Sequence, residues 1–194
     1  MIKLAVFSSG TGSNAARIIQ HFQDHPVIRV QLIVCNNPKA GVLNVAIEHH
    51  VPSLLIEKEQ FFRGDAYLPE LEKNQIDFLV LAGFLWKIPA ELVEAYPRRI
   101  INIHPALLPK YGGKGMYGHF VHEAVIASGE KESGITIHYV DELYDHGQTI
   151  FQAKVAVGPD DTPATLARKV QALEHKFFPL WIERVVNGNV SNPR

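Results

Sequence analysis

Two polar side chains end an apolar run in the middle of the chain and could do acid–base and hydrogen-bonding chemistry. Asn102 and His104 lie two residues apart, and side chains two apart on a strand share one face. An amide donor therefore stands beside an imidazole that titrates near neutrality. Pro105 has no backbone N–H, so the strand should end there, where open α/β sheets bind their ligands. The alternative is a pair that only satisfies local hydrogen bonds.

A second chemical feature is the glycine-rich turn Ser8–Asn14, which lies between a predicted strand and a predicted helix. Glycines let a backbone approach an anion, and a helix amino terminus offers free N–H groups. A dinucleotide turn would have glycine where Ala15 stands and an acidic residue where the next strand ends in Asn36. The turn therefore favours the isolated phosphate of a small substrate. A plain tight turn, with Ser13 or Asn14 as helix cap, is the alternative.

Three loops carry weaker chemical indications. Gly83–Pro89 is unusually apolar and could form a wall for a flat ring or simply pack against a helix. The irregular segment Leu107–Gly118 is either a functional loop or disordered. Asp141–Gly147 holds three carboxylates and a histidine, but no metal-binding spacing accompanies them, so no metal is expected. His119 and His122, at the start of a predicted helix, are expected to be solvated.

The elements that must position these residues follow from hydrophobic patterning and turn residues. Strands alternate with helices over most of the chain, and the last two strands can pair as a hairpin. A long final helix is expected to break or kink at Pro179. The predicted strands are 2–7, 27–35, 51–56, 78–82, 100–104, 133–140 and 149–157. The predicted helices are 15–20, 42–50, 65–74, 89–95, 120–128 and 161–186.

Composition indicates an ordinary globular protein. The 194 residues are 46% hydrophobic and 20% charged, with a net charge of -1, which argues against a nucleic-acid or membrane partner. Cys35 is the single cysteine, so no intramolecular disulfide can form. Without a repeat, linker or membrane-spanning run, residues 1–194 are expected to form one cytoplasmic domain, monomeric or homodimeric.

Together these motifs resemble the folate-dependent formyltransferases that act on glycinamide ribonucleotide in purine synthesis. The resemblance extends from the first strand to about Gly188. It implies an α/β, Rossmann-like open sheet of about seven mostly parallel twisted strands, with helices on both faces. The motifs that carry it are Ser9–Asn14, Leu81–Phe84, Asn102–Pro105, Leu107–Tyr111, Asp141–Leu143, Asp145–Gly147 and Gln171–His175.

The resemblance also implies the roles of individual residues, with 10-formyltetrahydrofolate as co-substrate and no metal. The catalytic residues would be Asn102, His104 and Asp145. The acceptor would be held by Gly12, Ser13 and Asn14 at its phosphate and by Glu174 at the rest of the ribonucleotide. The folate would be bound by Leu85, Trp86, Lys87, Ile88, Asn102, Asp141, Glu142, Leu143, Tyr144 and Asp145.

The implied chemistry needs no protein nucleophile, because the amine of the acceptor attacks the formyl carbon. Asn102 and a protonated His104 would stabilise the oxyanion, at about 3–4 kcal/mol per donor. Asp145 would keep His104 protonated, since a nearby opposite charge favours the charged form. A proton relay, with water taking part, would connect the amine to the leaving nitrogen.

The chain departs from the family pattern at two places. Trp86, followed by Lys87, stands where the family has a basic residue, which is tolerable if backbone groups hold the pterin. The loop Gly112–Gly118 is longer than usual, which could change folate affinity or acceptor choice.

Three other functions compete with this reading. A formyltetrahydrofolate hydrolase would share the catalytic residues and use water as acceptor, and a methionyl-tRNA formyltransferase would add a basic nucleic-acid-binding domain. Both are expected to be longer than 194 residues. A non-catalytic nucleotide-binding module would leave Asn102, His104 and Asp145 unexplained.

Overall fold

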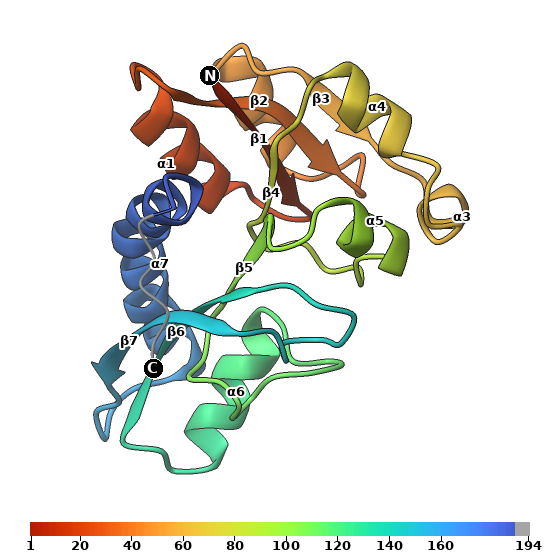
Figure 1. Cartoon of the computed structure of the whole chain (residues 1–194). Coiled ribbons are helices and arrows are strands. Elements are labelled where there is room, and N and C mark those ends of the chain that lie inside the picture. Colours follow the sequence, from red (N-terminus) through yellow and green to blue (C-terminus); the bar gives the residue numbers. More distant parts are fainter. Residues whose placement is uncertain (189–194) are drawn as a thin grey trace.

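The computed structural model describes residues 1–188 and is built on one seven-stranded sheet (Figure 1). The strand order is β3-β2-β1-β4-β5-β6-β7. The first five strands are parallel, whereas β6 runs antiparallel to β5 and β7 antiparallel to β6. The strands are β1 Ile2–Ser8, β2 Ile28–Cys35, β3 Ser53–Leu55, β4 Phe78–Leu81, β5 Ile100–His104, β6 Glu132–Tyr139 and β7 Thr149–Ala156.

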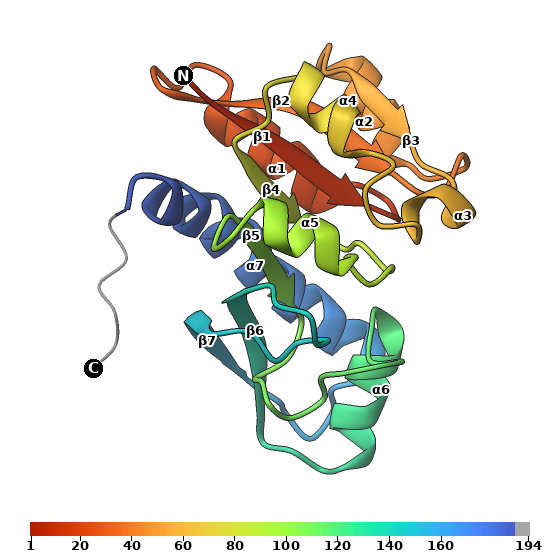
Figure 2. The same ribbon diagram turned by 45° about the vertical axis from the view of Figure 1, so that its right-hand side comes forward.

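Helices cover both faces of this sheet (Figure 2). One core contains buried side chains of α1, α2, α6 and α7, and a second contains those of α3, α4 and α5. The helices are α1 Ser13–Phe22, α2 Val42–Glu48, α3 Lys58–Phe61, α4 Leu68–Lys73, α5 Ala90–Ala95, α6 His119–Ala127 and α7 Pro163–Val186. The predicted α/β architecture, with about seven mostly parallel strands between two helical layers, is confirmed. Within residues 1–188, no helix combines the length and apolar character needed to cross a membrane.

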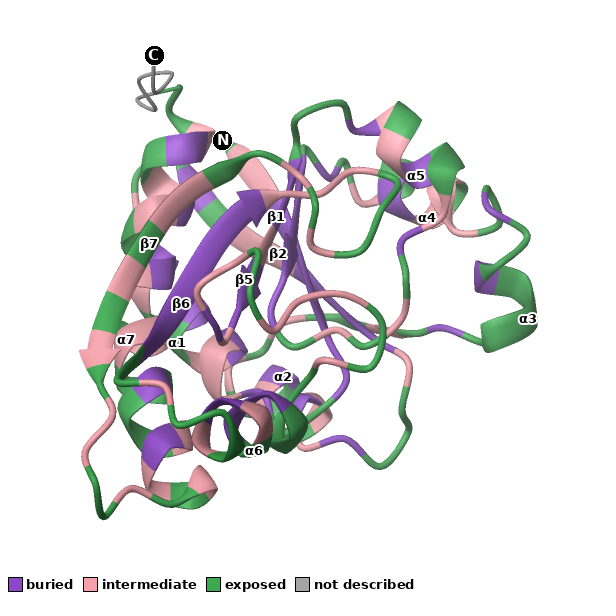
Figure 3. Ribbon diagram, turned by 90° about the horizontal axis from the view of Figure 1, so that it is seen from below, coloured by how far each residue is buried: buried purple, intermediate pink, exposed green. Residues whose placement is uncertain are grey.

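The central strands are buried on both faces because parallel strands between helical layers have no solvent side. In β1, Leu4 and Val6 enter the first core, whereas Ala5 and Phe7 enter the second. Figure 3 shows these strands as largely buried, whereas the surrounding helices alternate between buried and exposed residues. This packing explains why the strands read as unbroken apolar runs.

The carboxyl end of β5 lies in the middle of the sheet, between one parallel and one antiparallel neighbour. Asn102 is opposite Leu81 of β4 and His138 of β6, and His104 is opposite Thr136 of β6. The next residue, Pro105, lies outside the strand. β5 therefore presents Asn102 and His104 at its carboxyl end, as predicted.

Three predicted helices differ from those observed. The helix expected at 65–74 is shorter, Leu68–Lys73, and a separate turn of helix, α3, precedes it. The helix expected at 42–50 ends at Glu48, and His50 adopts a positive φ of 55°. Of the break or kink expected at Pro179, the break is wrong, because α7 continues to Val186. Burial of Ile182 in the core beyond the proline compensates for the missing N–H.

Candidate active site

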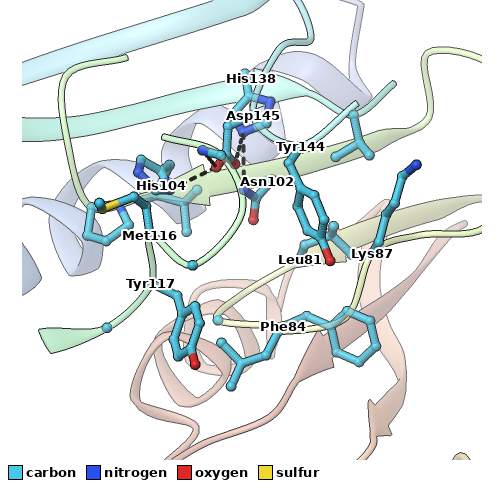
Figure 4. A pocket seen from close by; sticks show the side chains of 18 of the residues that line it. Leu81, Phe84, Lys87, Asn102, His104, Met116, Tyr117, His138, Tyr144 and Asp145 are labelled. Carbon is cyan, nitrogen blue, oxygen red and sulfur yellow. Dashed lines mark hydrogen bonds and ion pairs between the residues drawn. The ribbon is translucent and has the colours of Figure 1, made fainter. Parts of the chain in front are cut away.

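A cavity of about 690 Å³ opens beside the carboxyl ends of β4 and β5 (Figure 4). Its walls come from the loop after β4, the loop after β5, the loop after β6, and one side of α7. The three predicted catalytic residues, Asn102, His104 and Asp145, all line it. Their convergence from β5 and the loop between β6 and β7 agrees with the sequence prediction of one shared site.

The Asn102 amide is oriented by a residue that the sequence reasoning missed, His138 of β6. The Nδ1 of His138 is 2.8 Å from the Tyr139 carbonyl oxygen, so Nδ1–H donates there. Its Nε2 therefore accepts from the Asn102 amide at 3.1 Å. One Asn102 amide hydrogen is thus engaged and the other stays available. The register of the β5–β6 pair places the two residues opposite each other, and sequence alone does not fix that register.

The His104 ring is almost fully buried, with 4% of its surface exposed. Its Nε2 lies 2.7 Å from the carbonyl oxygen of Tyr111 and donates to it. Its Nδ1 lies 3.6 Å from Asp145 Oδ2. In the neutral ring Nδ1 is consequently the nitrogen without a hydrogen, and it faces the carboxylate. Proton uptake by His104 therefore occurs at Nδ1.

Asp145 connects the two histidines. Its Oδ2 accepts a 2.9 Å hydrogen bond from the Gly113 backbone N–H, and its Oδ1 lies 3.6 Å from Nε2 of His138. Its backbone has a positive φ of 56°, a conformation that costs an L residue about 1–3 kcal/mol and persists where surrounding contacts demand it. This strained backbone conformation at Asp145 orients its carboxylate toward His104 and His138 (Figure 4).

The protonation of His104 beside Asp145 differs from what the sequence predicted. Burial lowers the pKa of His104, against the opposing effects of Asp145 and the Tyr111 carbonyl. Burial alone would raise the pKa of Asp145, but the positive charges of His138 and His104 when these rings are protonated, and the Gly113 N–H, bring it below its usual value. The expectation that Asp145 keeps His104 protonated is therefore wrong for the free protein. Desolvation of a buried cation outweighs a carboxylate 3.6 Å away.

The glycine-rich turn forms the amino terminus of α1. Gly12 has a φ of 82°, and a Cβ there would lie 2.7 Å from the Cα of Val42. Only glycine fits this approach. The α1 terminus has no side-chain cap, so the capping role considered for Ser13 and Asn14 is wrong. The first N–H groups of α1 remain available to an anion.

The Ser13 and Asn14 side chains bond instead to α7. Ser13 Oγ accepts from Gln171 at 3.2 Å, and the Asn14 amide donates to Glu174 Oε2 at 2.8 Å. Burial raises the pKa of Glu174, with the Asn14 hydrogen bond opposing. Asn14 and Glu174 line the cavity, whereas Gly12 and Ser13 lie beside it. An anion at α1 would therefore adjoin the space that contains His104.

The opposite end of the cavity is formed by two loops that the resemblance implies for folate. Leu85, Trp86, Lys87 and Ile88 line it from the first loop. Ser9 Oγ fixes this loop by accepting the Leu85 backbone N–H at 3.0 Å.

From the second loop, Asp141, Leu143, Tyr144 and Asp145 line the cavity. Glu142 is exposed and does not line it, so its predicted place in the pocket is not supported.

Trp86, the departure from the family pattern, is anchored outside the catalytic centre. Its ring packs against Phe61 and Phe62, each at a centroid distance of 5.7 Å. The ring of Phe84 lies 6.2 Å away. The Trp86 side chain thus contributes to an aromatic cluster with α3, which fixes the backbone of the loop.

The loop before α6 closes the third side of the cavity. Residues Gly113–Gly118 line it together with His119. His119 is exposed, as expected, but His122 is 6% exposed and also lines the cavity. The prediction that His122 is solvated is therefore wrong, because α6 turns this face toward the interior. Among residues 1–188, no group of three or more His, Cys, Asp or Glu side chains is arranged to hold a metal ion.

Comparisons with known proteins agree with this geometry. The family model described as formyl transferase matches residues 2–182. A chloroplastic phosphoribosylglycinamide formyltransferase of Arabidopsis thaliana is 46% identical over 182 residues, covering 91% of this chain and 62% of the relative. The chain thus spans less than two thirds of that plant protein. A phosphoribosylglycinamide formyltransferase of Bacillus subtilis is 34% identical over 194 residues, 97% of each protein.

Solved structures give the same result. A glycinamide ribonucleotide transformylase from Symbiobacterium toebii superposes with a TM-score of 0.89 at 29% identity, covering 97% of this chain and 89% of that one. A phosphoribosylglycinamide formyltransferase from Bacillus halodurans superposes with a TM-score of 0.83 at 37% identity, covering 91% of each. The match spans the sheet and every loop that lines the cavity, and the chain belongs to the formyl transferase family.

Proposed function

We propose that this protein transfers the formyl group of 10-formyltetrahydrofolate to the amine of glycinamide ribonucleotide, a step of purine synthesis. The observation that carries the proposal is the meeting of Asn102, His104 and Asp145 in one cavity that extends to Asn14 and Glu174. Relatives over the full length of the domain have names that specify this acceptor. The hydrolase is not favoured because it requires no acceptor end. The nucleotide-binding module is not favoured because it leaves the meeting of Asn102, His104 and Asp145 unexplained.

The acceptor is proposed to bind between α1 and α7. Its phosphate would accept hydrogen bonds from the free N–H groups that follow Gly12, including those of Ser13 and Asn14, at the positive end of the helix dipole. Glu174 and Asn14 would hold the ribose hydroxyls, with the carboxylate accepting and the amide donating. This arrangement directs the amine toward His104, which is buried in the wall of the cavity.

The folate is proposed to occupy the other end of the cavity. Backbone groups of Leu85–Ile88 and Asp141–Asp145 would bind the flat pterin, and Trp86 would hold the first loop in place through the aromatic cluster. In this arrangement the formyl group lies near Asn102, and Tyr144 contributes apolar surface. No metal enters the proposal, since oxyanion stabilisation comes from hydrogen-bond donors.

Asn102 and His104 are proposed to stabilise the tetrahedral oxyanion. The Asn102 amide hydrogen that His138 does not engage donates to the oxygen as it gains charge. A donor placed in this way contributes about 3–4 kcal/mol. His104 is neutral in the free protein and becomes charged during the reaction, when the proton leaving the amine binds at Nδ1 beside Asp145. The imidazolium then lies between the tetrahedral oxyanion and the Asp145 carboxylate, and these two negative charges favour its formation.

The same proton completes the reaction. As the tetrahedral centre collapses, the carbonyl double bond reforms, the bond from carbon to N10 of the folate breaks, and N10 takes a proton. His104 returns the proton directly or through water and becomes neutral again. Asp145 stays ionised throughout, since its pKa lies below the usual value. The residues therefore cycle without a covalent intermediate on the protein.

We further infer that residues 1–194 act as one cytoplasmic domain on these small molecules, as a monomer or homodimer, without nucleic-acid or membrane partners. The formal charge of -1 supports this, because polyanionic partners select strongly basic surfaces.

The proposal is tested by incubating the purified protein with 10-formyltetrahydrofolate, with and without glycinamide ribonucleotide. The expected result is tetrahydrofolate formation that requires the amine and yields an equal amount of formylated ribonucleotide. Folate turnover without the amine would favour the hydrolase, and nucleotide binding without turnover would favour the module. Either result would contradict the proposed transfer.

A further inference from the structure

His122 is a buried histidine of the cavity that the proposed mechanism does not use. It lies on α6, which packs against α7, the helix that carries Gln171 and Glu174. Its side chain lines the same cavity as those residues and His104. Both histidines are buried, with 4% of the surface of His104 and 6% of that of His122 exposed. His122 thus shares one cavity with His104 and with Glu174.

The surroundings of the two ring nitrogens determine which one carries the hydrogen. Nδ1 of His122 is enclosed by protein and has no hydrogen-bond partner among residues 1–188. A hydrogen on Nδ1 would be a buried donor without an acceptor, which is costly. The neutral ring therefore keeps its hydrogen on Nε2, the nitrogen that remains accessible from the cavity.

His122 also resists a second proton. That proton would have to bind at the enclosed Nδ1, where no carboxylate or carbonyl receives it. Burial lowers the pKa of His122, and the charge of His104 lowers it further. The ring consequently stays neutral at physiological pH and offers the cavity a fixed N–H donor.

We propose that the Nε2–H of His122 donates a hydrogen bond to the glycinamide carbonyl oxygen of the acceptor and thereby determines acceptor specificity. This inference rests on the proposed function. In glycinamide ribonucleotide the carbonyl lies between the amine, which must reach the formyl carbon near His104, and the ribose, which would lie at Glu174. The proposal places His122 beside this carbonyl, because it lines the cavity together with His104 and Glu174. The Nε2–H of His104 is already engaged by Tyr111, so it is not free for this oxygen.

The test compares two amide substitutions that differ by one methylene. His122→Gln places an amide N–H close to the position of Nε2, whereas the shorter His122→Asn does not reach it. His122→Asn is expected to raise the KM for glycinamide ribonucleotide roughly 10- to 100-fold, the range for leaving one buried polar group unpaired. The KM for the folate should change by less than about twofold, and His122→Gln should stay within about fivefold of the wild type for both substrates.

Controls separate a structural role from a binding role. His49→Gln makes the same exchange at the end of α2, away from the cavity, and should have wild-type KM values. Thermal unfolding of each variant shows whether it is folded. If His122→Asn does not fold, His122→Met fills a similar volume without a donor and should show the same rise in acceptor KM.

Three results would overturn the inference. One is an unchanged acceptor KM in folded His122→Asn or His122→Met. Another is an equal rise in both KM values. The third is a large loss of kcat in His122→Gln with KM values unchanged, which would make His122 a proton carrier. Absence of any turnover of glycinamide ribonucleotide by the wild type would instead refute the proposed function, and with it this inference.

Discussion

Replacing His138 by phenylalanine should disable the site without touching the three predicted catalytic residues. His138 is 2% exposed and holds the Asn102 amide at 3.1 Å, while its Nε2 lies 3.6 Å from Asp145. Phenylalanine keeps the planar ring and removes both nitrogens. One Asn102 amide hydrogen and the Tyr139 carbonyl then lose their partners.

The expected size of the effect follows from these contacts. A buried donor left unpaired costs about 1–3 kcal/mol, so the variant should unfold at lower temperature and lower urea concentration than the wild type. Removing an oxyanion donor entirely lowers kcat by about 10²–10³. Asn102 is misdirected here and not removed, so we expect kcat to fall by roughly 10- to 100-fold.

The assay is steady-state formyl transfer at saturating concentrations of both substrates, with urea unfolding measured on the same samples. His146→Phe is the matched control, because His146 is exposed and does not line the cavity. The variant at 146 should keep wild-type kcat. If His138→Phe kept kcat within about twofold and unfolded like the wild type, the orienting role of His138 would be refuted.

Two further predictions concern the glycine turn and the charge of His104, the proposed catalytic histidine. Gly12→Ala should lower the free energy of unfolding by about 2–4 kcal/mol, because a Cβ at φ 82° would meet Val42 at 2.7 Å; a change below 0.5 kcal/mol in urea unfolding, on the order expected of a neutral surface site, would contradict this. NMR titration should give His104 a pKa below its usual value, since burial disfavours the charged ring, and Asp145→Asn should lower that pKa further by removing the carboxylate that opposes the shift. A His104 pKa above the usual histidine value would show that burial does not dominate, and an unchanged or higher pKa in Asp145→Asn would show that the carboxylate does not act on Nδ1.

Much of the site could be predicted because its residues follow short, strongly patterned segments. The apolar run before Pro105 fixed the end of β5 and placed Asn102 and His104 on one face. The glycines before α1 identified the turn beside Asn14, at the proposed acceptor end of the cavity. These inferences depend only on local periodicity and on residues with narrow backbone preferences.

What sequence did not reveal depends on register and on packing. His138 became identifiable only when the β5–β6 pairing set it opposite Asn102, and a slip of one residue would have turned it away. His122 appeared solvated because its helix begins in an irregular loop, so the buried face of α6 could not be assigned. The charge of His104 was missed because desolvation depends on the whole surrounding fold.

A double-mutant cycle on His104 and Asp145 tests most directly whether these residues form one catalytic unit. His104→Ala and Asp145→Ala should each reduce kcat for formyl transfer by at least about 100-fold. The kcat of the double variant should be within about threefold of that of the slower single variant, because the effects of residues that act together are not additive in free energy. Losses that multiply in the double variant, or either single variant at near wild-type rate while folded, would contradict the account.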